Sequence, residues 1–182
     1  LIKHYLKIAD EVNIPLILYN VPSRTACDLE PKTVSYLSAH PKIIGIKEAV
    51  DNEKRMDELL AISKKLKDKK NFSILSGDDP TFNSFMEKGA DGVISVAANI
   101  IPEDIAKICI FNLDKEFDKA IDLNNKFLNL YDLLFVESNP IPVKWVLEKM
   151  HKIESGIRLP LVPLNSVFHE EISREMSRLE LI

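Results

Sequence analysis

The 182-residue sequence predicts an α/β fold with a parallel sheet, and three observations support this prediction. Four short apolar runs alternate with segments whose apolar residues recur at helical spacing. The runs consist mainly of Ile, Leu and Val, a composition typical of strands that are buried on both faces. Proline and small polar residues separate the segments, as is common between the elements of βα units. Together these features favour consecutive βα units.

The elements of these units are assigned in order along the chain. Apolar residues at helical spacing predict a first helix over residues 1–13, and Pro15 ends it. Pro31 suits the first turn of the next helix, and Asp79 before Pro80 indicates a helix N-cap. The predicted helices of this part are residues 1–13, 31–39, 52–67 and 79–88. The predicted strands are residues 16–20, 43–49, 72–76 and 92–97.

After Asn99 the alternation stops and the chain reads as helices. The predicted helices of this tail are residues 102–111, 114–135, 140–151 and 165–181. Four βα units fit either a doubly wound open sheet or half of an eight-stranded barrel, whose full form takes about 250 residues. The five glycines form neither GxGxxG nor GxxxxGK[ST], the phosphate-binding loops of common doubly wound folds. Half of a barrel is therefore favoured. Because residue 1 already lies in a helical pattern, we expect a fragment.

Composition excludes several classes of protein. With 46 % hydrophobic and 29 % charged residues, the chain has enough apolar material for a core, and its apolar runs are far shorter than the roughly 20 residues that span a bilayer. The net charge of −4 argues against nucleic-acid binding. Cys27 and Cys109 form no CxxC pair, which indicates a reducing, cytoplasmic location and no zinc ribbon. The histidines show no ligand spacing, so we expect no metal.

Candidate catalytic residues lie at the carboxyl ends of the predicted strands, where barrel enzymes place their active sites. Lys47 directly follows an isoleucine-rich strand, and a lysine in apolar surroundings tends to lose its proton and become a Schiff-base nucleophile. The alternative is a lysine that reaches solvent and pairs with Glu48 or with an aspartate after the next strand.

Two further candidates come from the strand that ends at Tyr19 and the loop after it. The phenol of Tyr19 has the chemistry to relay protons to a ligand on Lys47, and the alternative is a core tyrosine with a satisfied hydroxyl. Arg24, in the turn over residues 21–25, presents a guanidinium suited to a substrate carboxylate. Its alternative is an ordinary surface ion pair.

Five stretches then carry a family resemblance. They are residues 19–25 (YNVPSRT), 45–49 (GIKEA), 75–79 (LSGDD), 89–96 (GADGVISV) and 139–144 (NPIPVK). They resemble the dihydrodipicolinate synthase family, also called 4-hydroxy-tetrahydrodipicolinate synthases. The resemblance implies a (β/α)8 TIM barrel, here its last four βα units plus a C-terminal helical region. Residues 1–101 would form the C-terminal half of the barrel, and residues 102–182 its last helix and the helical region.

The resemblance also implies roles for five residues. Lys47 matches the lysine that forms a Schiff base with pyruvate, and Tyr19 matches the tyrosine of the proton relay. Arg24 matches the arginine that holds the carboxylate of L-aspartate 4-semialdehyde. Ile94 matches the residue whose backbone carbonyl faces the site, and Gly77 lies where backbone lines the pocket.

The implied function is a lyase that condenses pyruvate with L-aspartate 4-semialdehyde in lysine and diaminopimelate biosynthesis. It needs no cofactor beyond the covalent Schiff base, and the family implies a cytoplasmic homotetramer built as a dimer of dimers. N-acetylneuraminate lyases and 2-keto-3-deoxy sugar-acid aldolases share the barrel, the tyrosine and the lysine, but Arg24 favours the synthase. A non-catalytic half-barrel is the third alternative. The family's threonine pair and lysine feedback site belong to the first half of the barrel and are not matched, so we expect incomplete activity.

Overall fold

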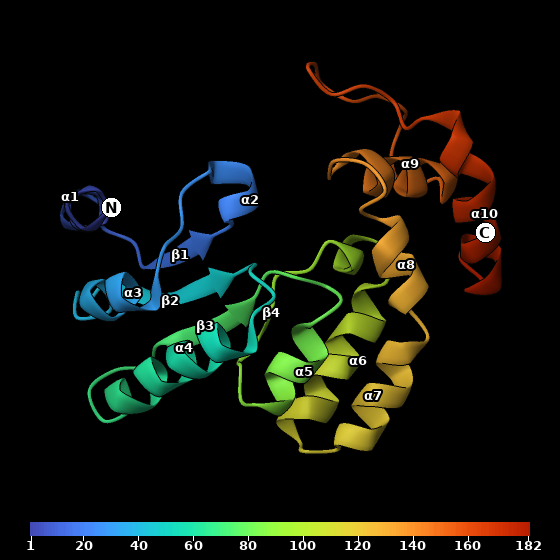
Figure 1. The fold of residues 1–182 in the computed structure, drawn as a ribbon. Coiled ribbons are helices and arrows are strands. Elements are labelled where there is room, and N and C mark those ends of the chain that lie inside the picture. Colours follow the sequence, from blue (N-terminus) through green and yellow to red (C-terminus); the bar gives the residue numbers. More distant parts are fainter. The chain divides into compact units, whose positions relative to one another are not determined.

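The computed structural model describes residues 1–182 and contains two compact units, Leu1–Ile94 and Ser95–Ile182 (Figure 1). The first unit holds a four-stranded sheet and its helices, and the second unit is helical. None of the helices is both long and apolar enough to cross a lipid bilayer. The domain boundary expected between residues 101 and 102 remains a prediction.

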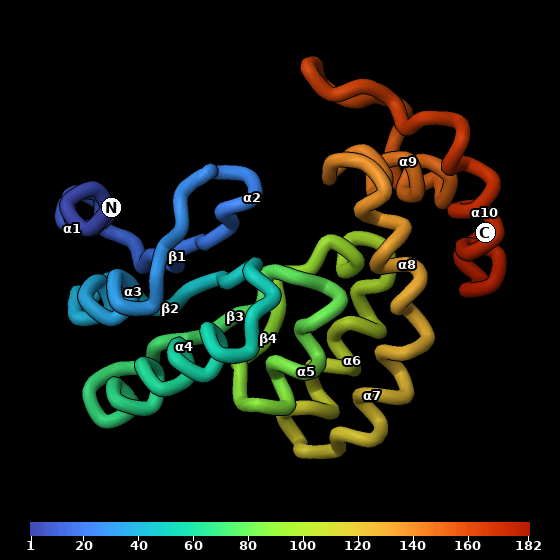
Figure 2. The backbone as a smooth tube through the Cα atoms, in the orientation of Figure 1, coloured from blue at the N-terminus to red at the C-terminus, as the bar shows by residue number.

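The sheet consists of four parallel strands in sequential order, β1-β2-β3-β4. The chain passes from each strand through a helical connection to the next strand (Figure 2). A doubly wound sheet reverses its strand order at a switch point, whereas a barrel adds each strand beside the previous one. The observed order is that of a barrel. The strands are β1 (Leu16–Asn20), β2 (Ile43–Glu48), β3 (Ser73–Ser76) and β4 (Gly92–Val93).

The helices of the first unit follow the same sequential order as the strands. They are α1 (Ile2–Glu11), α2 (Pro22–Thr25), α3 (Pro31–Leu37), α4 (Glu53–Leu66) and α5 (Phe82–Glu87). Helix α1 contacts α3, α3 contacts α4, and α4 contacts β3. The Asn52 side chain caps α4 by accepting a hydrogen bond from the Arg55 backbone N–H at 2.9 Å. These helices therefore bury one face of the sheet.

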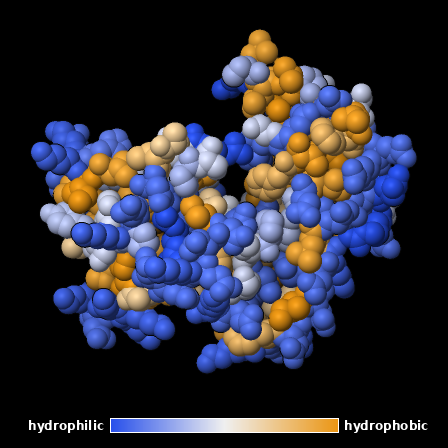
Figure 3. Space-filling view, viewed as in Figure 1, coloured by the Kyte–Doolittle hydropathy of each residue, from blue (hydrophilic) through white to orange (hydrophobic).

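The two faces of the sheet differ in burial. Leu18, Ile46 and Ile74 lie side by side in register on the helix-covered face, and each is at most 2 % exposed. Side chains alternate between faces along a strand, so their sequence neighbours point the other way. Three apolar side chains on or next to strands remain 44–46 % exposed: Ile17, Tyr19 and Ile94. Apolar patches also interrupt the largely polar surface in Figure 3.

Two predictions about the strand ends need correction. The strand expected over residues 92–97 has only two residues, because Ser95 leaves the ladder and its hydroxyl accepts a hydrogen bond from the Ala98 N–H at 2.9 Å. The N-cap expected at Asp79 is wrong, since α5 begins only at Phe82. The carboxylate of Asp78 instead accepts hydrogen bonds from the backbone N–H and hydroxyl of Thr81, at 3.2 and 2.6 Å.

The second unit contains the helices predicted for the tail, with one additional break. The helix expected over residues 114–135 is two helices, because α7 packs against α6 whereas α8 packs against α10. The core of this unit includes the fully buried side chains of Leu130, Val146 and Ile172. The elements are η1 (Ala97–Asn99), α6 (Pro102–Leu113), α7 (Phe117–Asn125), α8 (Leu128–Leu133), α9 (Ile141–Lys149), η2 (Ser166–Phe168) and α10 (His169–Arg178).

Candidate active site

The candidate site lies at the carboxyl ends of β1, β2 and β3 in the first unit. Tyr19 and Lys47 are directly paired residues of β1 and β2, so both side chains leave the sheet on the face opposite the helices. The Lys47 Nζ lies 4.4 Å from the centroid of the Tyr19 ring. This distance is that of a cation–π contact when the amine is protonated. The structure thus brings together the two residues predicted to act on the substrate.

The environment of Lys47 favours its neutral form. Burial lowers the pKa of the half-buried Lys47 amine, because desolvation penalises the charged ammonium. The negative charge of Asp79, which follows β3, opposes this shift. Asp79 is thus the aspartate after the next strand that the sequence offers as a partner for Lys47. The other predicted partner, Glu48, lies on the opposite face and does not pair with Lys47. A lysine with a lowered pKa supplies more free amine near neutral pH.

Gly77 gives the Lys47 side chain its space. A Cβ atom placed on Gly77 would lie 2.8 Å from Cε and 3.1 Å from Cγ of Lys47, so the lysine side chain would have to shift. The Gly77 N–H donates a hydrogen bond to the Glu48 carbonyl at 2.7 Å, so the backbone after β3 is held against the end of β2. The absence of a side chain at Gly77 therefore has a steric reason, while its role in lining a pocket remains a prediction. A larger residue would move the amine.

The other two predicted residues are less closely tied to Lys47. The Ile94 N–H donates to the Ser76 carbonyl at 2.9 Å, which continues the β3–β4 ladder by one residue beyond β4. Arg24 lies on the exposed helix α2, and its guanidinium makes no hydrogen bond or ion pair within the chain. The structure therefore leaves Arg24 free to bind an anion, and it does not bring this side chain into contact with Lys47.

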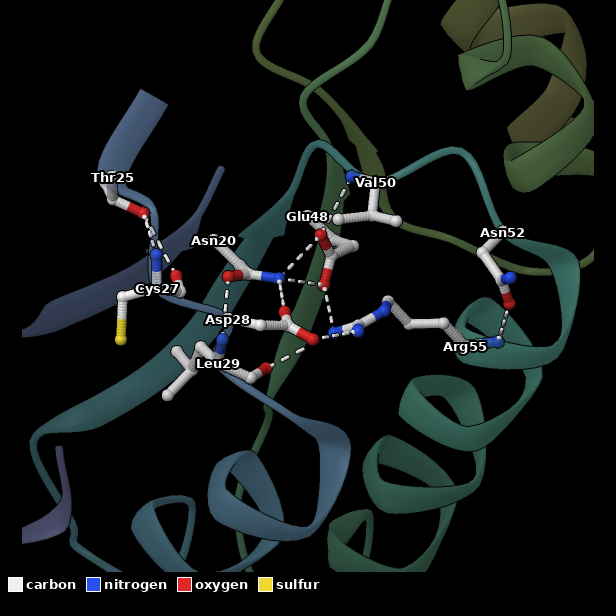
Figure 4. Close-up of polar contacts among 9 residues, drawn as sticks. All are labelled: Asn20, Thr25, Cys27, Asp28, Leu29, Glu48, Val50, Asn52 and Arg55. Atoms are coloured by element: carbon white, nitrogen blue, oxygen red, sulfur yellow. Dashed lines mark hydrogen bonds and ion pairs between the residues drawn. The ribbon is translucent and has the colours of Figure 1, made fainter. Parts of the chain in front are cut away.

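A polar cluster on the helix-covered face, with Asn20 and Glu48 buried at its centre, was not identified from the sequence. It is formed by Asn20, Asp28, Glu48 and Arg55, and we call it the Asn20 cluster (Figure 4). Asn20 and Glu48 are paired residues, each directly following Tyr19 or Lys47 along its strand. The alternation of strand side chains was the available signal, because it places these two polar residues on the face opposite the lysine.

The polar groups of the Asn20 cluster bond to one another and to neighbouring backbone groups of Leu29 and Val50. The Asn20 Nδ2 donates to Glu48 Oε1 and Oε2 at 3.0 Å each and to Asp28 Oδ1 at 2.9 Å. Arg55 reaches from α4 and forms ion pairs with both carboxylates. Burial raises the pKa of Glu48, because its hydrogen bonds from Asn20 and Val50 and the charge of Arg55 only partly offset desolvation. Asp28 is also partly desolvated, but Arg55 and Asn20 outweigh this effect and lower its pKa.

The residues present do not form a metal site. No group of three or more His, Cys, Asp or Glu side chains gathers where it would hold a metal ion. The Asp78 carboxylate accepts hydrogen bonds from Thr81, and Cys27 and Cys109 are free thiols. The side chains that the structure brings together at this site are the Lys47 amine and the Tyr19 phenol.

Comparison with known proteins identifies the family. A model of the dihydrodipicolinate synthetase family matches residues 1–179. The chain belongs to this family. The resemblance noted in the sequence is confirmed, and so is the fold class, a partial (β/α)8 barrel followed by C-terminal helices.

Relatives with known names agree with this assignment. A 4-hydroxy-tetrahydrodipicolinate synthase of Alcanivorax borkumensis is 45 % identical over 182 residues, which are 100 % of this chain and 60 % of the relative. The synthase of Teredinibacter turnerae is 42 % identical over 97 % of this chain and 59 % of the relative. The crystal structure of the Acinetobacter baumannii dihydrodipicolinate synthase with pyruvate aligns with a TM-score of 0.92 and 44 % identity, covering 100 % of this chain and 60 % of that one. The chain thus spans about three-fifths of the length of the relatives it matches.

Proposed function

We propose that this chain carries the Schiff-base chemistry of a 4-hydroxy-tetrahydrodipicolinate synthase, which condenses pyruvate with L-aspartate 4-semialdehyde. The observation that carries the proposal is Lys47: its amine is half-buried, has a lowered pKa and lies 4.4 Å from the Tyr19 ring centroid. Family membership and relatives that bear this enzyme name add support. Pyruvate is bound to the related Acinetobacter baumannii synthase, which matches the substrate proposed here.

The reaction follows from the nucleophilicity of the neutral amine. Lys47 attacks the ketone carbon of pyruvate, and water leaves as the C=N bond forms. Loss of a methyl proton gives an enamine, whose terminal carbon attacks the aldehyde carbon of the semialdehyde. The aldehyde oxygen takes up a proton and becomes the hydroxyl group of the product. The amino group of the semialdehyde then attacks the C=N carbon, which closes the ring and releases Lys47.

Tyr19 and Arg24 have separate proposed roles in this sequence of steps. The phenol of Tyr19, on the strand beside Lys47, carries protons to and from the reacting groups. Arg24 binds the carboxylate of the semialdehyde, since its guanidinium has no partner within the chain and offers bidentate hydrogen bonds. The backbone carbonyl of Ile94 and the backbone at Gly77 line the pyruvate site. Neither a metal nor an organic cofactor enters any step.

Trapping of the Schiff base tests the proposal directly. The chain is incubated with pyruvate and reduced with borohydride, and the modified residue is mapped by mass spectrometry. We expect one reduced pyruvyl group on Lys47, none in Lys47→Ala, and an unchanged adduct in Lys54→Ala, which removes an exposed lysine of α4. A folded chain that forms no adduct on Lys47 would contradict the proposal.

The acceptor and the biological setting complete the proposal. Addition of L-aspartate 4-semialdehyde should consume the pyruvate adduct, whereas an aldose or an amino sugar should not. Consumption by a sugar alone would instead favour a sugar-acid aldolase. We further propose that the product serves lysine and diaminopimelate synthesis in the cytoplasm, and that the enzyme works as a homo-oligomer. Full turnover is expected only where the remaining strands of the barrel complete the site.

A further inference from the structure

The segment of residues 21–29, which carries Arg24, begins directly after Asn20, and the Asn20 side chain holds its far end. Asn20 immediately precedes the segment, and its Oδ1 accepts a hydrogen bond from the Leu29 N–H at 2.9 Å. Its Nδ2 donates to Asp28 Oδ1 at the same end of the segment. Figure 4 shows the Asn20 amide between Glu48 and the Asp28–Leu29 backbone. A nine-residue excursion from the end of β1 is thereby closed at its base.

The same side chain also ties this base to the strand that bears Lys47. Asn20 is 1 % exposed and donates from Nδ2 to both oxygens of Glu48, which is fully buried. The Ala49 N–H donates to the Asn20 carbonyl at 3.0 Å, so backbone and side chain of Asn20 both hold the end of β2. The base of the Arg24 segment and the end of β2 are therefore joined through one residue.

Arg55 completes this connection from α4. Its guanidinium is paired with Asp28 and Glu48, and it also donates to the Leu29 carbonyl at 3.4 Å. Two carboxylates face one guanidinium, and Asn20 supplies the remaining donors. A buried polar group that loses its partner costs considerably more than an exposed one. The cluster consequently resists any change that moves residues 28–29 away from β2.

We propose that Asn20 is a positioning residue, which closes the base of segment 21–29 and so fixes Arg24 relative to Lys47 and Tyr19. This inference rests on the proposed function for the substrate-binding role of Arg24. The closure of the segment by Asn20 is a property of the fold and does not depend on that role. Asn20 touches no substrate, because its side chain points to the helix-covered face. It acts through Arg24, and its loss should affect the second substrate more than pyruvate.

Hydrogen exchange tests the closure without reference to catalysis. In Asn20→Ala, we expect the amides of residues 21–29, Leu29 above all, to exchange about tenfold faster or more. The hydrogen bonds of Asn20 that close the base of the segment are lost in this variant. Trypsin should also cleave after Arg24 faster. Exchange in α4 reports whether the variant is folded, and Glu58→Gln, an exposed change on α4, is the matched control. If Asn20→Ala does not fold, Asp28→Asn takes its place. This variant keeps the side-chain shape, and we expect it to increase the exchange rate by a smaller factor. Wild-type exchange in both variants would overturn the proposal.

A catalytic readout then separates positioning from a general structural role. The rate of borohydride-trapped pyruvate adduct on Lys47 should change less than about threefold in Asn20→Ala. The semialdehyde concentration that gives half-maximal consumption of the adduct should rise about tenfold or more. The reason is that a small displacement of Arg24 lowers the affinity for the semialdehyde carboxylate. An equal fall in both readouts would overturn the assignment to Arg24. Absence of the adduct in the wild type would contradict the proposed function, while the exchange experiment would still decide the role of Asn20.

Discussion

Tyr19 and Lys47 face each other across β1 and β2, with the lysine Nζ 4.4 Å from the centre of the tyrosine ring. Direct pairing in a parallel ladder places both side chains on the same face, and no intervening residue separates them. Their sequence neighbours, Asn20 and Glu48, pair in the same way on the other face. One pair of strand ends therefore carries the two proposed reacting groups on one face and two polar residues of the Asn20 cluster on the other.

Removing the charge of Asp79 should shift the pH dependence of Schiff-base formation. The negative charge of Asp79 keeps the proton on Lys47 against the effect of desolvation. In Asp79→Asn the pKa of Lys47 falls further, so free amine appears at lower pH and adduct formation below the midpoint rises about two- to tenfold. The measurement is the rate of borohydride trapping against pH. Asp78→Asn is the control, because the Asp78 carboxylate is hydrogen-bonded by Thr81, whereas Asp79 is the charge that raises the pKa of Lys47. An unshifted midpoint in a folded Asp79→Asn variant would refute the electrostatic link.

Gly77→Ala should impair Lys47 more than it impairs the fold. The new Cβ would lie 2.8 Å from Lys47 Cε and 3.0 Å from Ala49 Cβ, and because the lysine side chain is flexible the cost in stability is about 1 kcal/mol. Adduct formation should fall about ten- to hundredfold, because the amine is displaced. Gly92→Ala is the matched control, since its Cβ meets only Leu75 Cδ2 at an ordinary 3.5 Å.

A third glycine should show the opposite balance. Gly45→Ala would bring a Cβ to 2.6 Å from the Ser73 carbonyl oxygen, which belongs to the β3 backbone and cannot move aside. We expect a loss of about 1–3 kcal/mol in the free energy of unfolding, measured by urea denaturation. Equal stability losses in Gly45→Ala and Gly77→Ala would show that the two sites do not differ as the contacts indicate.

Glu48→Gln should remove a pH-dependent contribution to stability. Burial raises the pKa of Glu48 above its ordinary 4.5, so the folded state binds this proton more tightly than the unfolded chain. The resulting stabilisation is complete below the unfolded pKa and is lost as pH rises through the folded pKa. The stability of the wild type relative to Glu48→Gln should therefore decrease as pH rises above the ordinary glutamate pKa of 4.5, as followed by urea unfolding. Glu58→Gln, an exposed change on α4, is the control for the substitution itself.

Ala26→Gly should stabilise the turn after α2. Ala26 has a φ of 52°, in the left-handed region that costs a residue with a Cβ about 1 kcal/mol. Glycine relieves this cost but adds freedom to the unfolded chain, so the expected gain in unfolding free energy is about 0.5 kcal/mol. The exposed Ala61→Gly, inside α4, should lose about 1 kcal/mol. A loss in both variants would contradict the assigned strain at Ala26.

The sequence predicted the strands well where a strand is apolar and bounded by helix or proline signals. The run 16–20 is β1 without change, because Leu18 needs a buried face and Pro15 directly precedes the strand, after α1 has ended at Glu11. The fourth strand was predicted too long, since an apolar run continues past the point where its ladder ends. Pairing depends on the neighbouring strand, which a single run of residues does not reveal.

The candidate site also has a part that the sequence predicts and a part that it does not. The positions of Tyr19 and Lys47 at strand ends were predictable from local pattern, and so is the alternation that puts Asn20 and Glu48 behind them. The rest of the Asn20 cluster was not predictable, because Asp28 reaches Asn20 from a loop and Arg55 reaches Glu48 from α4. Such contacts depend on how the helix packs, which involves many weak interactions at once.

The Asn20 cluster also protects the pairing of β1 with β2 against a one-residue slip. Such a slip would exchange the faces of Lys47 and Glu48, because successive side chains point in opposite directions. The ammonium would then meet the Arg55 guanidinium and the Asn20 amide in a buried layer, and the carboxylate would stand where the nucleophile belongs. Mispaired chains would thus lose both their packing and their chemistry. The buried acid behind the lysine makes the active arrangement the one in which β1 and β2 can pair at low cost.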